Sequence, residues 1–539
     1  MLRNMIRKHL QLSGLQITLA LTALVSISIP VYADATLPAL LADHMVIQRG
    51  LPVHIWGMAA PHEAVGVTFR GETKSATADD DGRWSVYLSP GEAGGPFQLD
   101  IKATNTIVLN DILVGDVWVA SGQSNMEFPM SELVNAQTEI AAAQYPKIRL
   151  FMVKHKPADY PLEDVESKAW AACTPETVAD SSAVAYFFAR HLQQKLGVPI
   201  GLVEPFWGGT AAESWTSLRA LSADASLMPV FAARAKTVAE ESATVLREKR
   251  EEREFQLAVE QAKAEGKPMP AWRWHPDFAA WAPSALYNGM IAPLTPFAIR
   301  GVIWYQGEAN SGPDRAPLYA RVFQTMIRDW RNAWNEGDFP FLFVQIANWN
   351  TSPEGLWPEV RDAQRQALAL KNTGMAVTID IGDPEDIHPK NKQDVGLRLA
   401  LAARAIAFGE KIEYSGPLFR ELTPEDHALR VWFDHAAGLM TKDSAVTIPT
   451  AQSPMAQDST TKDSTAKPAA TPGEVTGFEV AGADGKYSPA EAKIEGESVI
   501  VSSAAVPKPV SVRYGWAANP ACNLFNKEGL PASPFQAPE

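Results

Sequence analysis

Cysteine is nearly absent from this chain: only Cys173 and Cys522 occur among 539 residues. Neither lies in a spacing typical of a metal site. If the protein is exported, one disulfide between them and two free thiols are both compatible with the sequence. A metal centre and a thiol nucleophile are therefore not expected.

Charged residues are also scarce, at 20% of the chain, and no basic cluster of the kind that binds phosphate groups is found. The net charge is −14. Binding to nucleic acid or to anionic membranes needs an excess of positive charge, so both classes of partner are excluded. A neutral or weakly charged ligand is expected. The hydrophobic content of 46% predicts a folded chain, and the length predicts two to four domains.

Long apolar runs are absent with one exception, at the N-terminus. A basic segment around Arg3 and Arg7 precedes an apolar stretch over residues 15–29, which ends shortly before the small-residue sequence VYA. This order is typical of a secretory signal peptide, predicted over residues 1–33, with an uncleaved membrane anchor as the alternative. We therefore expect an exported protein, periplasmic or extracellular, with no membrane span once the signal is removed.

Short alternating stretches separated by Gly, Pro and Asp fill residues 34–110, for example PVHIWGMA and WSVYLSP. They predict an N-terminal β domain, in which DDDGRW looks like a hairpin connection. Packing against the next domain is its expected role, and carbohydrate binding is the alternative. A second β region is predicted over residues 413–539, interrupted by a low-complexity linker at about 441–472.

Buried strands alternate with amphipathic helices over residues 111–412. Apolar runs such as IRGVIWYQG are followed by helical patterns such as LYARVFQTMIRDWRNAW. This α/β pattern predicts a mostly parallel sheet flanked by helices, with functional residues beyond the carboxyl ends of its strands. Residues 222–267 are rich in Glu, Lys, Arg and Ala. They predict a solvated helical insertion, with a partner-binding helix as the alternative.

Each strong strand of this region ends in a different polar group. The first leads into WVASGQSNMEF, where Ser124 follows Gly122 at a tight strand-to-helix turn. A serine there can expose its hydroxyl and direct its own N–H at a developing oxyanion, as attack on an ester requires. Taken alone, such a turn is more often only a helix cap.

Two further strands end in PFWGGTAAESW and WYQGEAN. Gly208 and Gly209 allow a backbone N–H to approach a ligand closely, although a plain glycine turn is the alternative. The side-chain amide of Gln306 can donate a hydrogen bond. Glu308 is either a buried structural acceptor or a member of a catalytic network.

The last strand leads into DIGDPEDIHPKNKQ, which places His388 after three acids, Asp383, Glu385 and Asp386. A histidine with a carboxylate beside it can act as a general base held in one tautomer. The combination of serine, glycine, glutamine and acid–histidine at successive strand ends is far more specific than any one member.

These motifs resemble the sialate O-acetylesterase family of the SGNH hydrolase superfamily, and so do LADHMVIQRGLPVHIWG and VRYGWAANPACNLFNKEGLPASPF in the flanks. The resemblance implies an SGNH-type sheet with accessory N-terminal and C-terminal β domains. Ser124 is then the nucleophile and His388 the base. The Ser124 N–H and a glycine N–H, from Gly208 or Gly209, would stabilise the oxyanion. Gln306 would be the third donor, where many SGNH enzymes have asparagine.

The resemblance leaves the identity of the acid open. The superfamily's usual aspartate, three residues before the histidine, corresponds here to Glu385. Asp386 is preferred for its position in the DIHP turn, and Asp383 and Glu385 are the alternatives.

The implied function is that of a serine carbohydrate esterase that removes O-acetyl groups from sialic acid or from acetylated polysaccharide of xylan type, without metal or organic cofactor. The alternatives are a broader SGNH lipase or thioesterase and a non-catalytic glycan-binding protein. Tryptophans near the motifs suit carbohydrate rings, although at least half are expected in the core. These tryptophans are Trp207, Trp215, Trp272, Trp274, Trp281, Trp304 and Trp349. The sequence indicates no oligomeric state.

Overall fold

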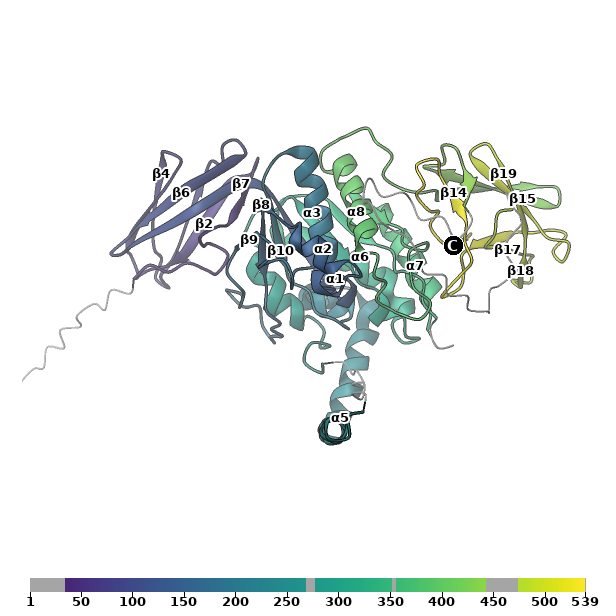
Figure 1. The fold of residues 1–539 in the computed structure, drawn as a ribbon, viewed down its shortest axis with the longest axis horizontal. Coiled ribbons are helices and arrows are strands. Elements are labelled where there is room, and N and C mark those ends of the chain that lie inside the picture. The colour runs from purple at the N-terminus through teal and green to yellow at the C-terminus, as the bar shows by residue number, and fades with distance from the viewer. Residues whose placement is uncertain (1–33, 268–276, 351–354, 443–473, 539) are drawn as a thin grey trace, which may run out of the picture.

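Three regions follow one another along the long axis of the molecule in Figure 1: a β region, a central α/β region and a second β region. The computed structural model describes residues 34–267, 277–350, 355–442 and 474–538. The predicted signal peptide, nearly all of the predicted linker, and Trp272 and Trp274 lie outside these residues. Within the described ranges, no helix is both long and apolar enough to span a bilayer.

The first region is a β-structure of six short strands and the start of a seventh. The short strands are β1 (Val46–Gln48), β2 (Val53–Met58), β3 (Ala64–Phe69), β4 (Glu72–Thr77), β5 (Arg83–Leu88) and β6 (Gly94–Lys102). Strands β2 and β5 form an antiparallel ribbon, whereas β3 pairs with β4 and β6. Along β2 and β5 buried residues alternate with more exposed ones, as expected for a half-buried sheet.

The predicted hairpin at DDDGRW is wrong. Strand β4 before the turn and strand β5 after it lie in different sheets. The turn itself is tight: Asp79 accepts hydrogen bonds from the N–H groups of Gly82 and Arg83. The residues of the turn therefore predicted the chain reversal. They did not predict the pairing partners of β4 and β5, which depend on packing between the two sheets.

One long strand joins the first region to the second. Strand β7 (Thr106–Gly122) pairs antiparallel with β6 in its first half and runs parallel to β10 (Ile200–Glu204) and β11 (Gly301–Tyr305) in its second. The boundary expected at residue 110 falls inside this strand. Because the strand is continuous, the N-terminal β region is tied directly to the strand that ends at Ser124.

The central sheet has the order β13-β12-β11-β7-β10-β8-β9. The neighbouring pairs are parallel except β8 with β9. The strands not yet given are β8 (Tyr145–Met152), β9 (Ala171–Cys173), β12 (Phe341–Val344) and β13 (Thr373–Ala376). Chain order reverses on either side of β7, so its carboxyl end is a topological switch point, where ligands of open α/β sheets bind.

Helices cover both faces of this sheet. On one face, Trp118 of β7 packs edge-on against Phe188 of α3 (Ala183–Leu196), and α3 packs against α8 (Lys392–Ile406). On the other, Trp304 of β11 contacts Phe323 and Trp330 of α6 (Ala316–Trp334). The mostly parallel sheet flanked by helices that the sequence predicts is confirmed.

The remaining helices are short, with one exception. They are α1 (Ser124–Glu127), α2 (Ala136–Ala141), α4 (Leu218–Ser222) and α7 (Trp357–Gln366). The exception is α5 (Met228–Glu265), which falls within the insertion predicted at residues 222–267 and projects away from the central region in Figure 1. Leu246 and Leu257 on α5 are 66% and 59% exposed, in keeping with a solvated helix.

The third region consists of antiparallel strands with a core of their own. Its strands are β14 (Leu418–Glu425), β15 (Ala428–Asp434), β16 (Met440–Thr441), β17 (Phe478–Ala481), β18 (Tyr487–Pro489), β19 (Glu491–Glu495), β20 (Ser498–Ser502), β21 (Ser511–Tyr514), β22 (Leu524–Phe525) and β23 (Phe535–Ala537). Buried Arg361 of α7 donates to the carbonyls of Ala517 and Ala518, which joins this region to the central one.

The two cysteines do not pair. Cys173, at the end of β9, is buried, and Cys522 is half-buried near Tyr514. Burial raises the pKa of both thiols to about 12, so neither is a thiolate at neutral pH. The alternative of two free thiols, which the sequence left open, is the one that the structure contains.

Candidate active site

Ser124 stands at the carboxyl end of the central strand. Gly122 ends β7 with a φ of 141°, and a Cβ there would lie 2.2 Å from the carbonyl oxygen of Tyr305. Only glycine fits this approach of β7 to β11. Ser124 opens the short helix α1, so its N–H is one of the helix N-terminal donors that has no intrahelical acceptor.

His388 reaches Ser124 from the loop before α8. Its Nε2 lies 2.8 Å from Oγ of Ser124, although the two residues are 264 positions apart in the chain. This is the nucleophile–base contact that acyl transfer needs. The serine of the SGQSNM motif and the histidine of the DIHP turn therefore lie within hydrogen-bond distance of each other.

Asp386 is the acid that the structure places beside the imidazole. Its Oδ1 accepts the backbone N–H of His388 at 2.8 Å and lies 3.8 Å from Nδ1 of the ring. The other two acids have different contacts: Asp383 accepts from the N–H of Glu385, and Glu385 accepts from the side chain of Asn350. The 3.8 Å distance is an ion-pair contact, longer than a hydrogen bond.

The pKa of His388 is lowered from its ordinary value. Burial is the main cause, because it disfavours the charged imidazolium, and the positive charge of Lys392 adds to it. The nearby Asp386 acts in the opposite direction. The imidazole is therefore mostly neutral at pH 7, which is the state in which it can accept a proton.

A cavity of about 460 Å³ opens over the Ser124 hydroxyl. Its apolar lining consists of Phe128, Pro129, Met152 and Phe206. Its other lining residues are Ser124, Ser131, His388 and three acids, Glu127, Glu132 and Asp180, and neither lysine nor arginine is among them. The nearby Lys168 and Lys390 are each paired with an acid, Asp180 and Asp386 respectively.

Gly208 lies against the serine. A Cβ on Gly208 would be 3.3 Å from Cβ of Ser124, so a larger residue would crowd the nucleophile. Its N–H donates to the carboxylate of Glu127, 2.5 Å away. Glu127 also pairs with His155, whose ring stacks on Trp207 at 4.3 Å. Gly209 adopts a φ of 71° and accepts a hydrogen bond from Trp281.

Gln306 is not positioned as the sequence predicts. Its side chain is fully buried, and its amide N–H groups donate to the carbonyl of Thr210 at 3.1 Å and to Oδ1 of Asn310 at 2.6 Å. Its Oε1 accepts from the hydroxyl of Tyr319. Because both donors are used, neither is free for an oxyanion in this conformation. The residue type indicated a donor, but the packing that occupies it is not visible in sequence.

Glu308 belongs to a buried polar cluster beneath the serine. Its Oε1 accepts from the amide of Asn125 at 2.6 Å, and Oδ1 of Asn125 accepts from Nζ of Lys392 at 2.5 Å. Asn125 also donates to the carbonyl of Ile387, next to His388. The cluster therefore ties the serine turn, the turn after β11 and the histidine loop together.

Sequence reasoning missed three residues of this site. Asn125 and Lys392 are both 1% exposed, and Glu127 faces the cavity. All three lie inside the quoted motifs SNMEF and HPKNKQ. Burial lowers the pKa of Lys392 to about 7, and burial also raises the pKa of Glu308. The available signal was a polar or charged residue within four positions of Ser124 or His388.

Two of the tryptophans near the motifs, Trp215 and Trp304, are fully buried. Trp207, Trp281 and Trp349 are half-buried. Trp207 lies near the cavity, since it follows the lining residue Phe206 and stacks on His155.

A doubly wound sheet with a serine–histidine pair at its switch point is characteristic of esterases with an SGNH-type fold. A carbohydrate acetylesterase of known structure from Xanthomonas citri is 36% identical, with a TM-score of 0.76. The alignment covers 94% of this chain and all of that one. The protein is thus an acetylesterase of the carbohydrate esterase class.

The particular family follows from sequence comparison. Residues 247–407 match the family model described as carbohydrate esterase, sialic acid-specific acetylesterase. The sialate O-acetylesterase of Mus musculus is 33% identical over 448 residues, 75% of this chain and 79% of that protein. The Homo sapiens enzyme is 33% identical over 408 residues, 68% of this chain and 69% of that protein. This chain belongs to the sialate O-acetylesterase family.

Proposed function

We propose that the protein hydrolyses O-acetyl esters of neutral sugars by acyl transfer through Ser124, with His388 as general base and Asp386 as the acid that orients it. The observation that carries this proposal is the 2.8 Å contact between Ser124 Oγ and His388 Nε2 at the carboxyl end of β7, inside an open cavity.

The reaction proceeds in two steps. His388 accepts the proton of Ser124 as Oγ attacks the acetyl carbonyl, and the tetrahedral intermediate collapses when the imidazolium returns the proton to the leaving sugar oxygen. Water then enters, His388 accepts one of its protons, and attack on the acetyl-serine releases acetate and restores the hydroxyl of Ser124. Asp386 stabilises the imidazolium formed in each step.

The oxyanion donors that fit this geometry are backbone N–H groups. The Ser124 N–H is at the start of α1, where the helix dipole also favours negative charge. The Gly208 N–H lies beside the serine but is held by Glu127. Glu127 must move away, or be displaced by substrate, for Gly208 to act as the second donor.

The lining of the cavity supports a neutral sugar. A sialic acid ester carries a carboxylate, which three acidic side chains at the cavity, Glu127, Glu132 and Asp180, would repel. An acetylated polysaccharide of xylan type has no such charge. Activity on sialic acid is the second candidate, which the names of the mammalian relatives favour. Catalysis after export remains a proposal supported by the N-terminal segment.

The test is acetate release by wild type and Ser124→Ala from 4-nitrophenyl acetate, acetylated xylan and 9-O-acetyl sialic acid. We expect Ser124→Ala to lose about 10⁴-fold or more in kcat while staying folded by circular dichroism. Ser131→Ala is the matched control, because Ser131 lines the same cavity. Retention of activity in Ser124→Ala contradicts the assignment, and a preference for sialic acid contradicts the neutral substrate. A longer-chain 4-nitrophenyl ester preferred over acetate would favour the lipase alternative.

A further inference from the structure

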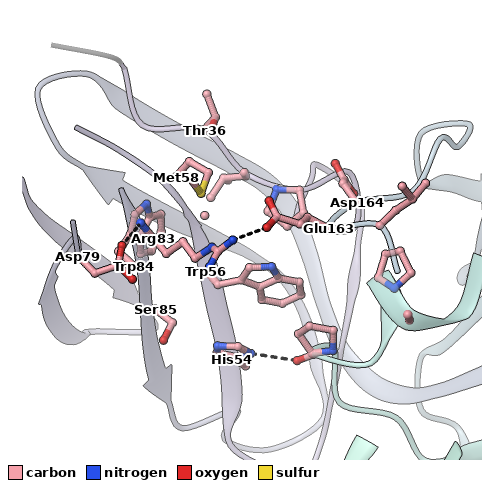
Figure 2. Close-up of a pocket in the computed structure, with 17 residues that line it drawn as sticks. Thr36, His54, Trp56, Met58, Asp79, Arg83, Trp84, Ser85, Glu163 and Asp164 are labelled. Carbon is pink, nitrogen blue, oxygen red and sulfur yellow. Dashed lines mark hydrogen bonds and ion pairs between the residues drawn. The ribbon is translucent and has the colours of Figure 1, made fainter. Parts of the chain in front are cut away.

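A second cavity, of about 560 Å³, lies between the N-terminal β region and the central region. It shares no lining residue with the cavity at Ser124. One wall is the outer face of the β2–β5 ribbon (Figure 2). The opposite wall comes from the loop that contains Glu163 and Asp164 and from the segment ending at Pro296.

The outer face of the ribbon is unusually apolar for a solvent-facing sheet surface. Trp56 and Met58 alternate with the core residues of β2, and Tyr87 lies on the same face of β5. Met58 is 39% and Tyr87 60% exposed. An outward face is normally polar, as it is on β4 with its sequence ETKSAT. Of these residues Trp56 and Met58 line the cavity, and apolar surface rimmed by polar residues is typical of an interaction site.

The aromatic rings are ordered with respect to one another. His54 stacks on Tyr87 with centroids 4.5 Å apart, and on Trp56 with centroids 4.8 Å apart. Figure 2 shows the indole of Trp56 between two contacts that bridge the walls. One is the His54 Nδ1 hydrogen bond to the carbonyl of Pro296, at 3.0 Å, and the other is the ion pair of Arg83 with Glu163.

These contacts already join the two walls without a ligand. A third bridge reinforces them, because the N–H of Ala39 donates to the carboxylate of Asp164 at 3.1 and 3.0 Å. A cavity whose walls are already held together loses little entropy on binding. Its size lies within the range of about 300–1,000 Å³ that is usual for ligand sites.

The charges around the cavity select against an anion. Three carboxylates, Asp79, Glu163 and Asp164, line it against one guanidinium, that of Arg83. Burial lowers the pKa of His54, so this ring adds no positive charge at pH 7. An aromatic ring with flanking hydrogen-bonding groups suits a neutral sugar, whose C–H face packs on the ring while its hydroxyls reach the polar groups.

One loop connects the two cavities. His155 pairs with Glu127 beside the serine, and Glu163, eight residues further along, lines the second cavity. Fully extended, eight residues span at most about 28 Å, so the two sites lie within reach of one polymer chain. A small acetyl ester that fills the cavity at Ser124 does not contact the second cavity.

We propose that this second cavity is a glycan-binding site that holds an unesterified stretch of a neutral polysaccharide, with Trp56 as the ring on which a sugar packs. The proposal assigns to the N-terminal β region a binding role in addition to packing. Binding itself does not depend on the identity of the catalytic residues. Its kinetic consequence rests on the proposed function.

The direct test measures binding of deacetylated xylan, xyloglucan and galactomannan to the full mature chain by affinity electrophoresis. We expect at least one polymer to retard the wild-type protein. Trp56→Ala should bind that polymer with about tenfold lower affinity, which is the loss expected when roughly 60 Å² of apolar ring surface is no longer buried against the sugar. Trp432→Ala is the matched control, since Trp432 lies on a β-sheet of the C-terminal region. Failure of wild type to bind any of the three, or equal binding by Trp56→Ala, overturns the proposal.

A kinetic test separates this site from the catalytic one. Trp56→Ala should raise KM for the acetylated form of the bound polymer about tenfold with kcat unchanged, and leave 4-nitrophenyl acetate hydrolysis as in wild type. Equal loss on both substrates would mean a structural role for Trp56 and contradicts the proposal. If Ser124→Ala keeps its esterase activity while Trp56→Ala loses polymer binding, the proposed catalytic assignment fails and the glycan site stands.

Discussion

Two polar groups of residues meet at the carboxyl end of β7, and they differ in access to solvent. The cavity group consists of Ser124 and His388, which line the cavity, and of Asp386, which lies beside the His388 ring. The side chains of His388 and Asp386 are both 37% exposed. The buried group contains Asn125, Gln306, Glu308 and Lys392, none of which exceeds 8% exposure. Ser124 and His388 can touch substrate and Asp386 contacts His388 directly, whereas the buried group can act only by holding or polarising these residues.

This difference gives the two groups different expected phenotypes. A change in the cavity group should lower turnover and leave the free energy of unfolding nearly intact. A change in the buried group should lower stability first, because it leaves a buried donor or acceptor without a partner. Substitutions on each side of this boundary can break the distinction or sharpen it.

The largest effect that discriminates within the cavity group is expected for Asp386→Asn. The amide keeps an oxygen that can accept the His388 N–H but loses the charge that stabilises imidazolium, so kcat/KM should fall about 100-fold or more. The measurement is 4-nitrophenyl acetate hydrolysis with parallel urea unfolding. Asp383→Asn and Glu385→Gln are matched controls, expected within about threefold of wild type. A larger loss in Glu385→Gln than in Asp386→Asn would transfer the acid's role to Glu385.

Gln306→Ala tests the buried group. It leaves the Thr210 carbonyl and the Asn310 side chain without their donor, so the free energy of unfolding should fall by about 1–3 kcal/mol. The turnover of the folded fraction should stay within about threefold, whereas loss of an oxyanion donor would lower it about 100-fold or more. Tyr319→Phe, which removes the hydroxyl bonded to Gln306, is the control and should cost about 1 kcal/mol. A 100-fold loss in kcat for Gln306→Ala alone would restore the role that the sequence predicts.

The fate of Gln306 illustrates how far the sequence could go. Hydrophobic periodicity and turn residues predicted the parallel sheet and the tight turn at Gly122, because each depends on a local pattern. The partnership of Ser124 with His388 was implied by the family resemblance, and the two side chains lie 2.8 Å apart in the structure. These local patterns do not predict the direction in which a side chain points. Whether the amide of Gln306 faces the cavity or the core depends on Asn310 and Tyr319, whose positions are set by tertiary packing.

The same limit explains the misassigned hairpin and the missed lysine. The DDDGRW turn has the residues of a reversal, but pairing of β4 with β3 and of β5 with β2 is decided by two sheets that pack together. Lys392 lies inside the HPKNKQ motif, and only the fold shows that it is 1% exposed and bonded to Asn125. Hydrophobic periodicity and turn residues can be recognised locally in the sequence, whereas long-range packing cannot.

Glu127→Gln tests whether the acidic lining of the cavity influences the choice of substrate. Removing one negative charge from the cavity should raise kcat/KM for 9-O-acetyl sialic acid, relative to an acetylated xylo-oligosaccharide, by about tenfold. The amide oxygen can still accept the Gly208 N–H, so folding should be unaffected. Glu497→Gln makes the same change in net charge on an exposed position of the C-terminal region and should leave the ratio unchanged. An unchanged ratio in Glu127→Gln would mean that this charge does not contribute to selection.

The smallest expected effect is that of the buried group on the pKa of His388 in the cavity group. His388 acts as a base only when neutral, so kcat/KM should rise with pH through the pKa of His388, which lies below its ordinary value. The pKa of Lys392 is about 7, so Lys392 is charged over the acidic range in which His388 titrates, and its charge favours the neutral imidazole. Lys392→Met removes that charge, and the acidic limb of the pH–rate profile should move to higher pH.

Variants at two exposed charges make this shift interpretable even if Lys392→Met folds poorly. The charge of Lys390 also lowers the pKa of His388, to a lesser degree, so Lys390→Met should move the acidic limb in the same direction by a smaller amount. Asp386 raises that pKa, so the residual activity of Asp386→Asn should show the limb moved to lower pH. Opposite displacements in Lys390→Met and Asp386→Asn would show that nearby charge tunes the base, and a displacement to higher pH in Lys392→Met would show that the buried group takes part in this tuning. Identical profiles in all three would reduce Lys392 to a support for Asn125.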